Sequence, residues 1–348
     1  MLGATSTVGQ HPTDPVDPVL SVRDLSTTLR TGQGDVHAVR GVSFDLAPGE
    51  VLGVVGESGA GKSMLLLSIA GLAPASIVRS IEGAALLGGR DLLRLTPRQR
   101  QRVLGHELTM IFQDPGTTLN PLMAVGDQIA EVITNHAAVP RRQLWARVIR
   151  LLDTVGIPAA ARRVDDYPHQ LSGGMRQRVG IAIAIANEPK VILADEPTTA
   201  LDVTIQAQIL DVLAEARART GAATILVTHD LGVIAEVADR VLVMYGGRVQ
   251  ESASVGTLFE DPRHPYSLAL MSCQPRLHGD EPARSIPGSP PNVTEAVVGC
   301  VFAPRCSRRM SMCLEIEPEL EPVEPGHPVA CHAVNADLAG ERTDVAAR

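Results

Sequence analysis

The sequence predicts an α/β fold in which a parallel sheet presents a phosphate-binding loop. Residues 56–63 fit the pattern G-x-x-x-x-G-K-[ST]. The apolar run 51–55 before them predicts a buried strand, and 64–70 after them predicts a helix, which is the context that the pattern requires. Further apolar runs at 191–194 and 223–227 alternate with helical segments, as in a parallel sheet covered on both faces.

The segment before the loop predicts an antiparallel sheet. Residues 19–47 mix polar and apolar side chains in the manner of strands, and turn sequences at 31–35 and 47–50 bound them. A further hairpin is predicted at 81–90, after the first helix. We expect these strands to form a second sheet that leads into the strand before the phosphate-binding loop.

Helical patterns dominate between residues 121 and 170. They predict helices at 126–135 and 141–154, the second with Leu144, Val148, Leu151 and Leu152 on one face. We therefore expect a helical subdomain, at about 121–180, inserted between two halves of the α/β core. The other expected core elements are a short basic helix from residue 97, strand 108–112, helix 180–186, strand 191–194, helix 204–219, strand 223–227 and strand 241–244.

Composition narrows the class of protein. The 348 residues are 45% hydrophobic but only 2% aromatic, so a large core must be built from aliphatic side chains. The net charge of -8 argues against a protein that coats nucleic acid, and no apolar run reaches the length of a membrane span. Residues 1–18 have neither a basic start nor an apolar block, so we expect a disordered leader rather than a secretion signal. Any membrane connection is then expected to come through partner proteins.

The residue types of the loop match the chemistry of phosphate binding. Glycines let successive backbone N–H groups curl around phosphate oxygens, and the start of the following helix adds its dipole. The lysine supplies positive charge to the outer phosphates, and the final serine offers a hydroxyl to Mg²⁺. The expected phosphate-binding residues are Gly56, Ser58, Gly59, Ala60, Gly61, Lys62 and Ser63.

Two acids at the end of strand 191–194 predict the catalytic edge of the site. Asp195 lies where a carboxylate that helps to hold Mg²⁺ is expected, and Glu196 follows as a general base or water-positioning group. The alternative is an acidic pair that merely starts a helix, and the phosphate-binding loop favours the nucleotide role. Ser172-Gly173-Gly174 forms a second anion-binding helix start, although one nucleotide needs only one phosphate-binding loop.

This ensemble resembles the ATP-binding cassette (ABC) family of ATPases over about residues 19–335. The loop matches the family's Walker A motif, and Asp195 and Glu196 match Walker B and the catalytic glutamate. The further matches, in the family's order, are Gln113 of the Q-loop, Leu171–Met175 of the LSGGQ signature, Ala200-Leu201-Asp202 of the D-loop and the switch histidine His229.

The resemblance implies that two cassettes pair head to tail and sandwich two ATP molecules. Gln113 would join Ser63 and Asp195 at Mg²⁺, and His229 and Gln113 would support catalysis by Glu196. The residues expected to complete the partner's ATP site are Ser172, Gly173, Gly174 and Met175, with Asp202 in the D-loop.

Two positions depart from the family pattern. Met175 stands where many members have Gln. The aromatic residue expected to stack on adenine is not obvious in the strands before the loop: Leu29 occupies the position expected for it, and His37 is a possible substitute. The group that contacts adenine is therefore left open.

The C-terminal part narrows the resemblance. Residues 261–267, 286–291 and 299–306 look like the ATPases of the oligopeptide, dipeptide and nickel importers. We expect an ABC domain over 19–255, an appendage with little regular structure over 256–335, and a flexible tail over 336–348.

Four cysteines of the appendage predict a metal staple. Cys300, Cys306, Cys313 and Cys331 have the spacing C-x5-C-x6-C-x17-C, in a chain where disulfides are not expected. Zinc sites usually show C-x2-4-C pairs, whereas an iron–sulfur cluster tolerates wider spacing, and reduced free thiols are the third alternative. The importer resemblance implies a [4Fe–4S] cluster. Cys273 stands apart and is expected to be packed.

The function expected from the resemblance is that of an ATP-hydrolysing subunit of a peptide importer, peripheral to the cytoplasmic face of the membrane. Its partners would be a second cassette, expected to be a paralogue, two membrane-spanning permease subunits and an extracytoplasmic solute-binding protein. Nickel and glutathione importers are alternatives. A soluble ABC ATPase of DNA repair or translation is disfavoured because the chain has one cassette and no heptad run. A non-catalytic module is disfavoured by Glu196 and His229.

Overall fold

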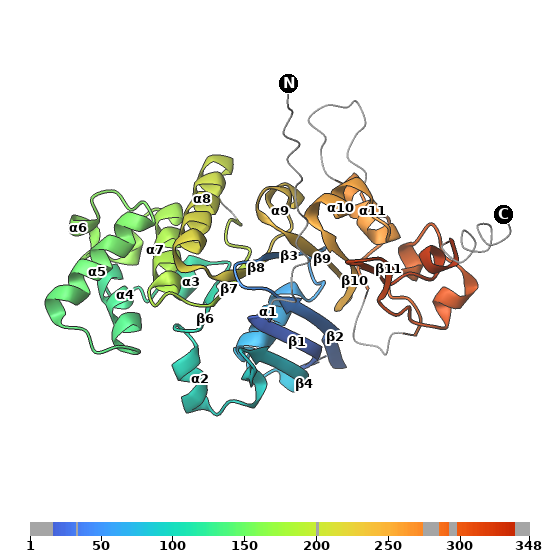
Figure 1. The fold of residues 1–348 in the computed structure, drawn as a ribbon, viewed down its shortest axis with the longest axis horizontal. Helices are drawn as coiled ribbons and strands as arrows, with labels where there is room; N and C mark the ends of the chain where they lie inside the picture. The colour runs from blue at the N-terminus through green and yellow to red at the C-terminus, as the bar shows by residue number, and fades with distance from the viewer. Residues whose placement is uncertain (1–16, 33, 200–201, 274–284, 292–297, 338–348) are drawn as a thin grey trace, which may run out of the picture.

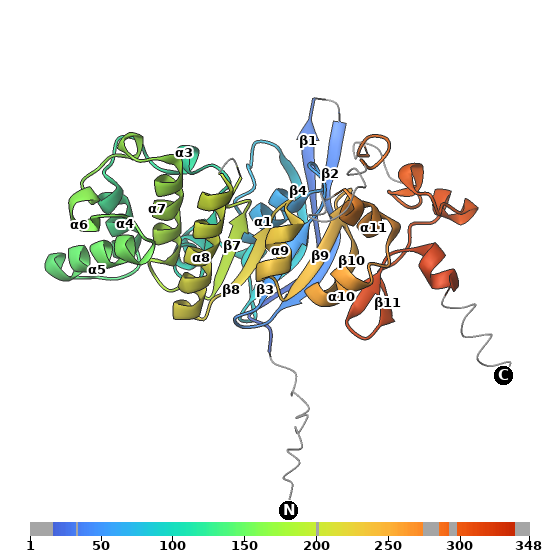
Figure 2. The same ribbon diagram turned by 90° about the horizontal axis from the view of Figure 1, so that it is seen from above.

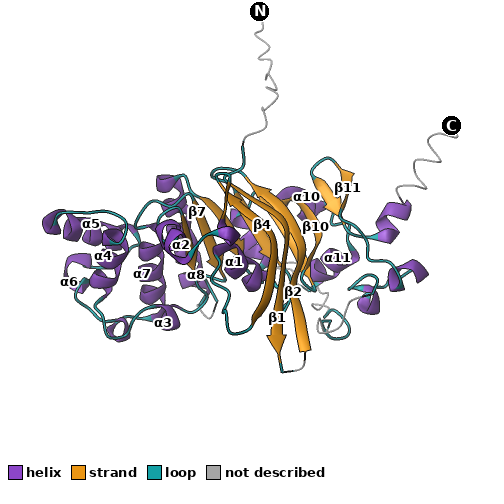
Figure 3. Ribbon diagram, turned by 90° about the horizontal axis from the view of Figure 1, so that it is seen from below, coloured by secondary structure: helices purple, strands orange, loops and turns teal. Residues whose placement is uncertain are grey.

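The chain forms two sheets and a set of helices, arranged along one long axis (Figure 1). The structure is a computed structural model, and it describes residues 17–32, 34–199, 202–273, 285–291 and 298–337. One end is formed by the helices α4 (Val125–Thr134), α5 (Arg141–Thr154) and α6 (Ala160–Arg163). The sheets lie in the centre, and the C-terminal strands lie at the other end (Figures 1 and 3). The central part positions the predicted phosphate-binding loop.

The larger sheet has eight strands in the order β11-β12-β10-β9-β3-β8-β7-β6. Its middle is parallel, with β3 between β9 and β8, while β10, β12 and β11 add antiparallel strands at one edge. This confirms the predicted parallel core. The strands are β3 (Val51–Val55), β6 (Leu108–Ile111), β7 (Val191–Asp195), β8 (Ala223–Val227), β9 (Arg240–Tyr245), β10 (Arg248–Ser254), β11 (Glu321–Glu324) and β12 (His327–Val329).

Strand β3 is buried on both faces of the sheet. All five of its residues are buried, and alternate residues enter different cores. Val51 and Val55 pack with α7 to α9, whereas Leu52 and Val54 pack with α1 and the second sheet. A Cβ at Gly53 would lie 2.7 Å from the side chain of Ile234 in α9, so glycine allows this helix to pack closely. The helices are α1 (Lys62–Ala70), α7 (Gly173–Ile185), α8 (Val203–Thr220) and α9 (Leu231–Val237) (Figure 2).

The second sheet is antiparallel, as predicted, with the strand order β2-β1-β4-β5. It packs on α1 across the apolar cluster that includes Leu20, Val22 and Leu65. A buried hydrogen bond of 2.7 Å joins the hydroxyl oxygens of Thr27 and Ser68 across this contact. The strands are β1 (Leu20–Thr31), β2 (Gly34–Leu46), β4 (Val78–Leu87) and β5 (Arg90–Asp91).

The predicted helices of the insertion are present. Leu144, Val148 and Leu152 of the predicted apolar face of α5 are buried, whereas Leu151 is only partly buried against the same core. Among the described residues, no helix is long and apolar enough to cross a membrane. The remaining helices are α2 (Pro97–Val103), α3 (Pro115–Thr118), α4 (Val125–Thr134), α5 (Arg141–Thr154), α6 (Ala160–Arg163), α10 (Val255–Glu260) and α11 (Pro265–Ser272), with 3-10 turns at Leu92–Arg94, Pro168–Gln170, Ala303–Arg305 and Ser311–Leu314.

The C-terminal part has more order than its composition predicts. The β11–β12 hairpin continues the large sheet through β10, and Ala330 N–H donates to Gln250 O at 2.8 Å. The Glu251 carboxylate is fully buried and accepts hydrogen bonds from the backbone N–H groups of Arg263 and His264. The ring of His327 contacts the same carboxylate at 2.6 Å. These contacts attach the C-terminal segment to the core rather than leaving it beside the core.

Candidate functional site

The phosphate-binding loop joins β3 to α1, as the sequence predicts. Gly56 has φ +152°, and a Cβ there would lie 2.2 Å from Met244 O. Gly61 has φ +97°, and a Cβ there would lie 2.1 Å from Ala38 O. A larger residue at either position meets both backbone strain and a steric clash, so the close passage of the loop between β2 and β9 depends on glycine.

Lys62 lies inside the loop. Its ammonium group donates to Gly56 O at 2.7 Å and to Glu57 O at 3.0 Å. Burial lowers the pKa of this lysine, and the nearby charges of Glu196, Asp195 and Glu57 oppose that change. Both of these acceptors are neutral backbone carbonyls, and the phosphates of a nucleotide would be stronger acceptors.

Ser63 and Asp195 meet across the sheet edge. The Ser63 hydroxyl donates to Asp195 Oδ1 at 2.9 Å. Burial raises the pKa of Asp195, the hydrogen bond from Ser63 opposes the change, and the charge of Glu196 adds to it. A hydroxyl oxygen beside a carboxylate oxygen is a donor set suited to a hard cation such as Mg²⁺.

Glu196 is the centre of the polar network at this edge. Its Oε2 atom accepts hydrogen bonds from Gln113 Nε2 at 3.1 Å and Thr199 Oγ1 at 2.7 Å, and it lies 3.2 Å from His229 Nδ1. Its backbone has φ +44°, a strained conformation for a residue with a side chain, fixed by an N–H bond to Val227 O at 2.9 Å. Three residues predicted from sequence thus converge, while Thr199 was missed because a lone threonine carries no pattern.

The second predicted anion-binding segment starts α7. Ser172 caps this helix by accepting a hydrogen bond from Met175 N–H at 3.3 Å, and a Cβ at Gly174 would lie 2.8 Å from Ile205 in α8. Asp202 caps α8 in the same way, through Ile205 N–H at 3.0 Å. Helices α7 and α1 lie apart in Figures 1 and 2, and the hydrogen bond of the Ser172 hydroxyl is made within its own helix. Ala200 and Leu201 of the predicted D-loop lie outside the described residues.

The two positions considered for adenine contact lie on neighbouring strands. Leu29 of β1 pairs with Val36 of β2, and His37 is hydrogen-bonded to Thr28 Oγ1 through Nδ1 at 3.2 Å. His37 lines an open hollow of about 280 Å³, and Leu29 is not among the residues that line it. The hollow is lined by Ser26, His37, Val39, Arg40, Gly41, Arg248 and Glu317.

The four cysteines are near one another but are not placed as a metal site. Burial raises the pKa of Cys300 to about 11, and the neighbouring thiols of Cys313 and Cys331 add to the rise. Burial also raises the pKa of Cys306 and of Cys331, in each case with a contribution from the Cys313 thiol. In the described part of the chain, no three or more His, Cys, Asp or Glu side chains form a metal-binding group. The prediction of a metal staple is therefore not supported by the geometry.

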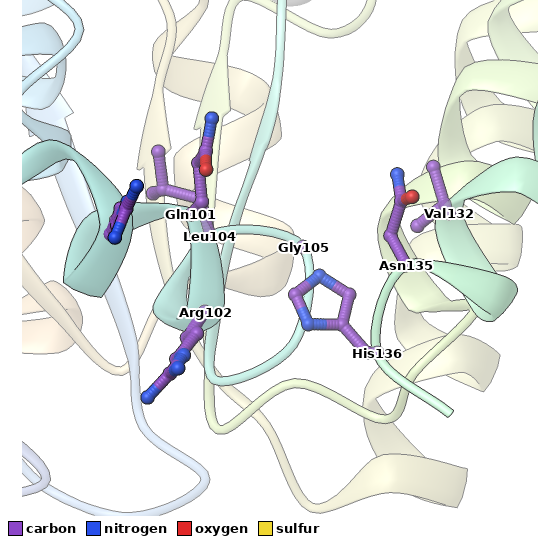
Figure 4. Close-up of a pocket in the computed structure, with 8 residues that line it drawn as sticks. Gln101, Arg102, Leu104, Gly105, Val132, Asn135 and His136 are labelled. Carbon is purple, nitrogen blue, oxygen red and sulfur yellow. The ribbon is translucent and has the colours of Figure 1, made fainter. Parts of the chain in front are cut away.

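A basic hollow lies between α2 and the end of α4 (Figure 4). It has a volume of about 670 Å³, and His136 and Asn135 enter it from one side while Arg102 lies on the other. It contains no residue of the phosphate-binding loop or of the Glu196 network, so it is separate from the nucleotide site.

The loop, the Ser63–Asp195 pair and the Glu196 network define a P-loop nucleotide-binding protein. A family model described as "ABC transporter" matches residues 39–199, and one described as "Oligopeptide/dipeptide transporter, C-terminal region" matches residues 250–313. The chain belongs to the ABC transporter family, as the sequence motifs predict.

Curated relatives agree with this assignment. The chain is 46% identical over 321 residues to the "Probable peptide ABC transporter ATP-binding protein y4tR" of Sinorhizobium fredii, covering 92% of this chain and 96% of that one. It is 46% identical over 324 residues to the "Oligopeptide transport ATP-binding protein OppD" of Bacillus subtilis, with 92% and 90% covered. It is 49% identical over 319 residues to OppD of Mycobacterium tuberculosis, where 91% of this chain but only 52% of the relative is covered. The chain thus spans about half the length of that mycobacterial relative.

Solved structures share the fold. The dimeric structure of the ATP-binding cassette MJ0796, in a post-hydrolysis state with ADP and Pi, matches with a TM-score of 0.61 and 26% identity. The match covers 68% of this chain and 98% of that one.

Proposed function

We propose that this chain is an ATP-hydrolysing subunit of an ABC importer for peptides. The observation that carries the proposal is the convergence of Lys62, Ser63, Asp195 and Glu196 at one edge of the sheet. This is the set of charges and oxygen donors that binding and hydrolysis of Mg²⁺–ATP require.

Each residue of this set would have a separate role in the hydrolysis of ATP. Lys62 and the N–H groups of the loop would hold the phosphates, and Ser63, Asp195 and Gln113 would hold Mg²⁺, which supplies charge neutralisation when it is bound. Glu196 would orient the attacking water and accept its proton. Because His229 and Gln113 both contact Oε2, they would keep that carboxylate aimed at the water.

Ser172 to Met175 would serve a second cassette. The start of α7 is the positive end of a helix dipole, and α7 lies apart from α1, the helix that follows the chain's own loop. A head-to-tail pair would place Ser172, Gly173, Gly174 and Met175 on the partner's ATP, and Asp202 at the contact between the cassettes. The dimeric form of the related cassette MJ0796 supports the pairing of two cassettes.

The peptide assignment rests on the relatives and on the C-terminal family match. The partners would be a second cassette, a paralogue in our proposal, two permease subunits and an extracytoplasmic solute-binding protein, with this chain at the cytoplasmic face. We place permease docking at residues 120–131, where the Leu122 side chain is 84% exposed. The basic hollow beside the end of α4 adjoins this segment and could receive acidic residues of the permease.

The role of the four cysteines is a separate proposal. Burial raises the pKa values of the Cys300, Cys306 and Cys331 thiols, which makes their thiolates costly, and a bound cation would relieve that cost. We propose that Cys300, Cys306, Cys313 and Cys331 move together to hold a [4Fe–4S] cluster, with zinc as the second candidate. Iron, sulfide and zinc analysis of anaerobically purified protein tests this, with Cys273→Ser as the matched control. Metal-free protein would contradict the proposal.

ATP hydrolysis by the assembled complex tests the transport proposal. The complex with its permeases, second cassette and binding protein is supplied in turn with peptides, Ni²⁺ or glutathione. We expect peptides to stimulate hydrolysis. Stimulation by Ni²⁺ or glutathione alone would replace the peptide assignment, and ATPase activity without any permease requirement would favour a role outside transport.

A further inference from the structure

A buried ion pair joins the C-terminal segment to the phosphate-binding loop. The Arg305 guanidinium donates to both carboxylate oxygens of Glu57, at 2.5 Å and 3.0 Å. The Arg305 side chain is only 4% exposed and that of Glu57 is 25% exposed. Glu57 is the second residue of the loop, between Gly56 and Ser58, so the pair acts directly on the predicted ATP site.

The remaining donors of Arg305 are also used. Its Nε–H donates to Pro287 O at 2.8 Å, Nη2 donates to Ile286 O at 3.1 Å, and Nη1 donates to the Tyr245 hydroxyl at 3.1 Å. Every nitrogen of the guanidinium therefore has a partner, and its two-pronged contact with Glu57 has a fixed direction.

The backbone of Glu57 is held by the same region. Its N–H donates to the hydroxyl of Tyr266 in α11 at 2.8 Å. The ring of Tyr266 packs against those of Tyr245 and Phe302, with centroid distances of 4.6 Å and 5.3 Å. Residues that follow the cassette core thus form hydrogen bonds with both the side chain and the backbone of Glu57.

The negative charge of Glu57 links this ion pair to nucleotide binding. The Glu57 carboxylate is close enough to Lys62 to affect its ionisation, and Lys62 also donates to Glu57 O. The phosphates of ATP would bind beside the same lysine. Without Arg305, the loop would present an uncompensated negative charge to an anionic ligand.

We propose that Arg305 is a positioning residue of the nucleotide site, which holds the phosphate-binding loop through Glu57 and neutralises its charge. The C-terminal segment then sets the affinity for ATP. The inference rests on the proposed binding of ATP by this loop. If the ion pair were purely structural, its loss would lower stability, and removal of both of its charges would not restore nucleotide affinity.

The test measures the affinity of the full-length chain for a fluorescent ATP analogue with Mg²⁺. Arg305→Met should raise Kd about 10-fold, since an unpaired charge near the phosphates acts at an effective dielectric well below that of water. Arg305→Lys keeps the charge but loses the fork and should fall between wild type and Arg305→Met. The double variant Glu57→Gln/Arg305→Met should return to within about threefold of wild type, because no charge is left unpaired.

Two controls separate the possible causes. Arg308→Met removes an exposed arginine of the same segment, paired with Asp337, and should leave Kd unchanged. Lys62→Ala should abolish binding; if it does not, the ATP site itself is misassigned. If Lys62→Ala abolishes binding but Arg305→Met binds as wild type, or the double variant binds as weakly as Arg305→Met, the positioning role is wrong. Should Arg305→Met fail to fold, wild-type affinity in Arg305→Lys would equally contradict it.

Discussion

Replacement of Glu196 by Gln tests the assignment of the catalytic base. Three groups converge on one oxygen, Oε2: the amide of Gln113, the hydroxyl of Thr199 and the ring of His229. A glutamine can place its carbonyl oxygen at that point and keep the hydrogen bonds from Gln113 and Thr199. We therefore expect the free energy of unfolding to change by no more than about 1 kcal/mol.

The chemical step should respond much more strongly. An amide cannot accept the proton of the attacking water, and loss of a general base typically lowers rates about 100- to 10,000-fold. We expect kcat for ATP hydrolysis to fall within that range while KM changes little, because Glu196 is not among the residues proposed to hold the phosphates.

The assay is phosphate release by the assembled complex at saturating ATP, with thermal unfolding measured on the same preparations. Glu215→Gln, on the exposed surface of α8, is the matched control and should have no effect on either measurement. Hydrolysis by Glu196→Gln at the parental rate would refute the reasoning, whatever its stability.

Three further predictions concern the same site. Asp195→Asn should raise the Tm measured without nucleotide, because burial raises the pKa of Asp195 and its ionisation therefore costs stability at every pH above the unfolded-state pKa. Equal Tm values for variant and wild type at pH 7 would contradict this. The same variant should lose Mg²⁺-dependent hydrolysis. Gly61→Ala should lose nucleotide binding and destabilise the chain by about 2 kcal/mol or more, since its Cβ meets Ala38 O and its φ is positive; thermal unfolding and ATP-analogue binding check this. If the His37 ring contacts adenine, His37→Ala should weaken the binding of ATP more than the binding of inorganic triphosphate. An equal loss of affinity for both ligands would exclude that contact.

The sequence predicted those parts of the fold and site that depend on short patterns. Apolar runs located β3, β7 and β8, and the glycine pattern located the loop that follows β3. The carboxyl ends of parallel strands lie at one edge, so the meeting of Ser63 with Asp195 could also be expected.

Other features depend on contacts between distant segments and could not be predicted in this way. Arg305 lies 248 positions from Glu57, and nothing near either residue in the sequence indicates the pair. The β11–β12 hairpin was missed because its strands are short and rich in proline and charge, and they are stabilised mainly by the edge they join. The cysteine spacing indicated a metal site that the geometry does not show.

Uptake of a labelled peptide into vesicles tests the central claim most directly. The vesicles contain the complete complex, with ATP supplied on the side of this chain and peptide-loaded binding protein on the opposite side. We predict ATP-dependent accumulation that is lost when Lys62→Ala replaces the wild-type chain in the complex. Peptide accumulation that persists with Lys62→Ala, or that occurs without ATP, would contradict the account.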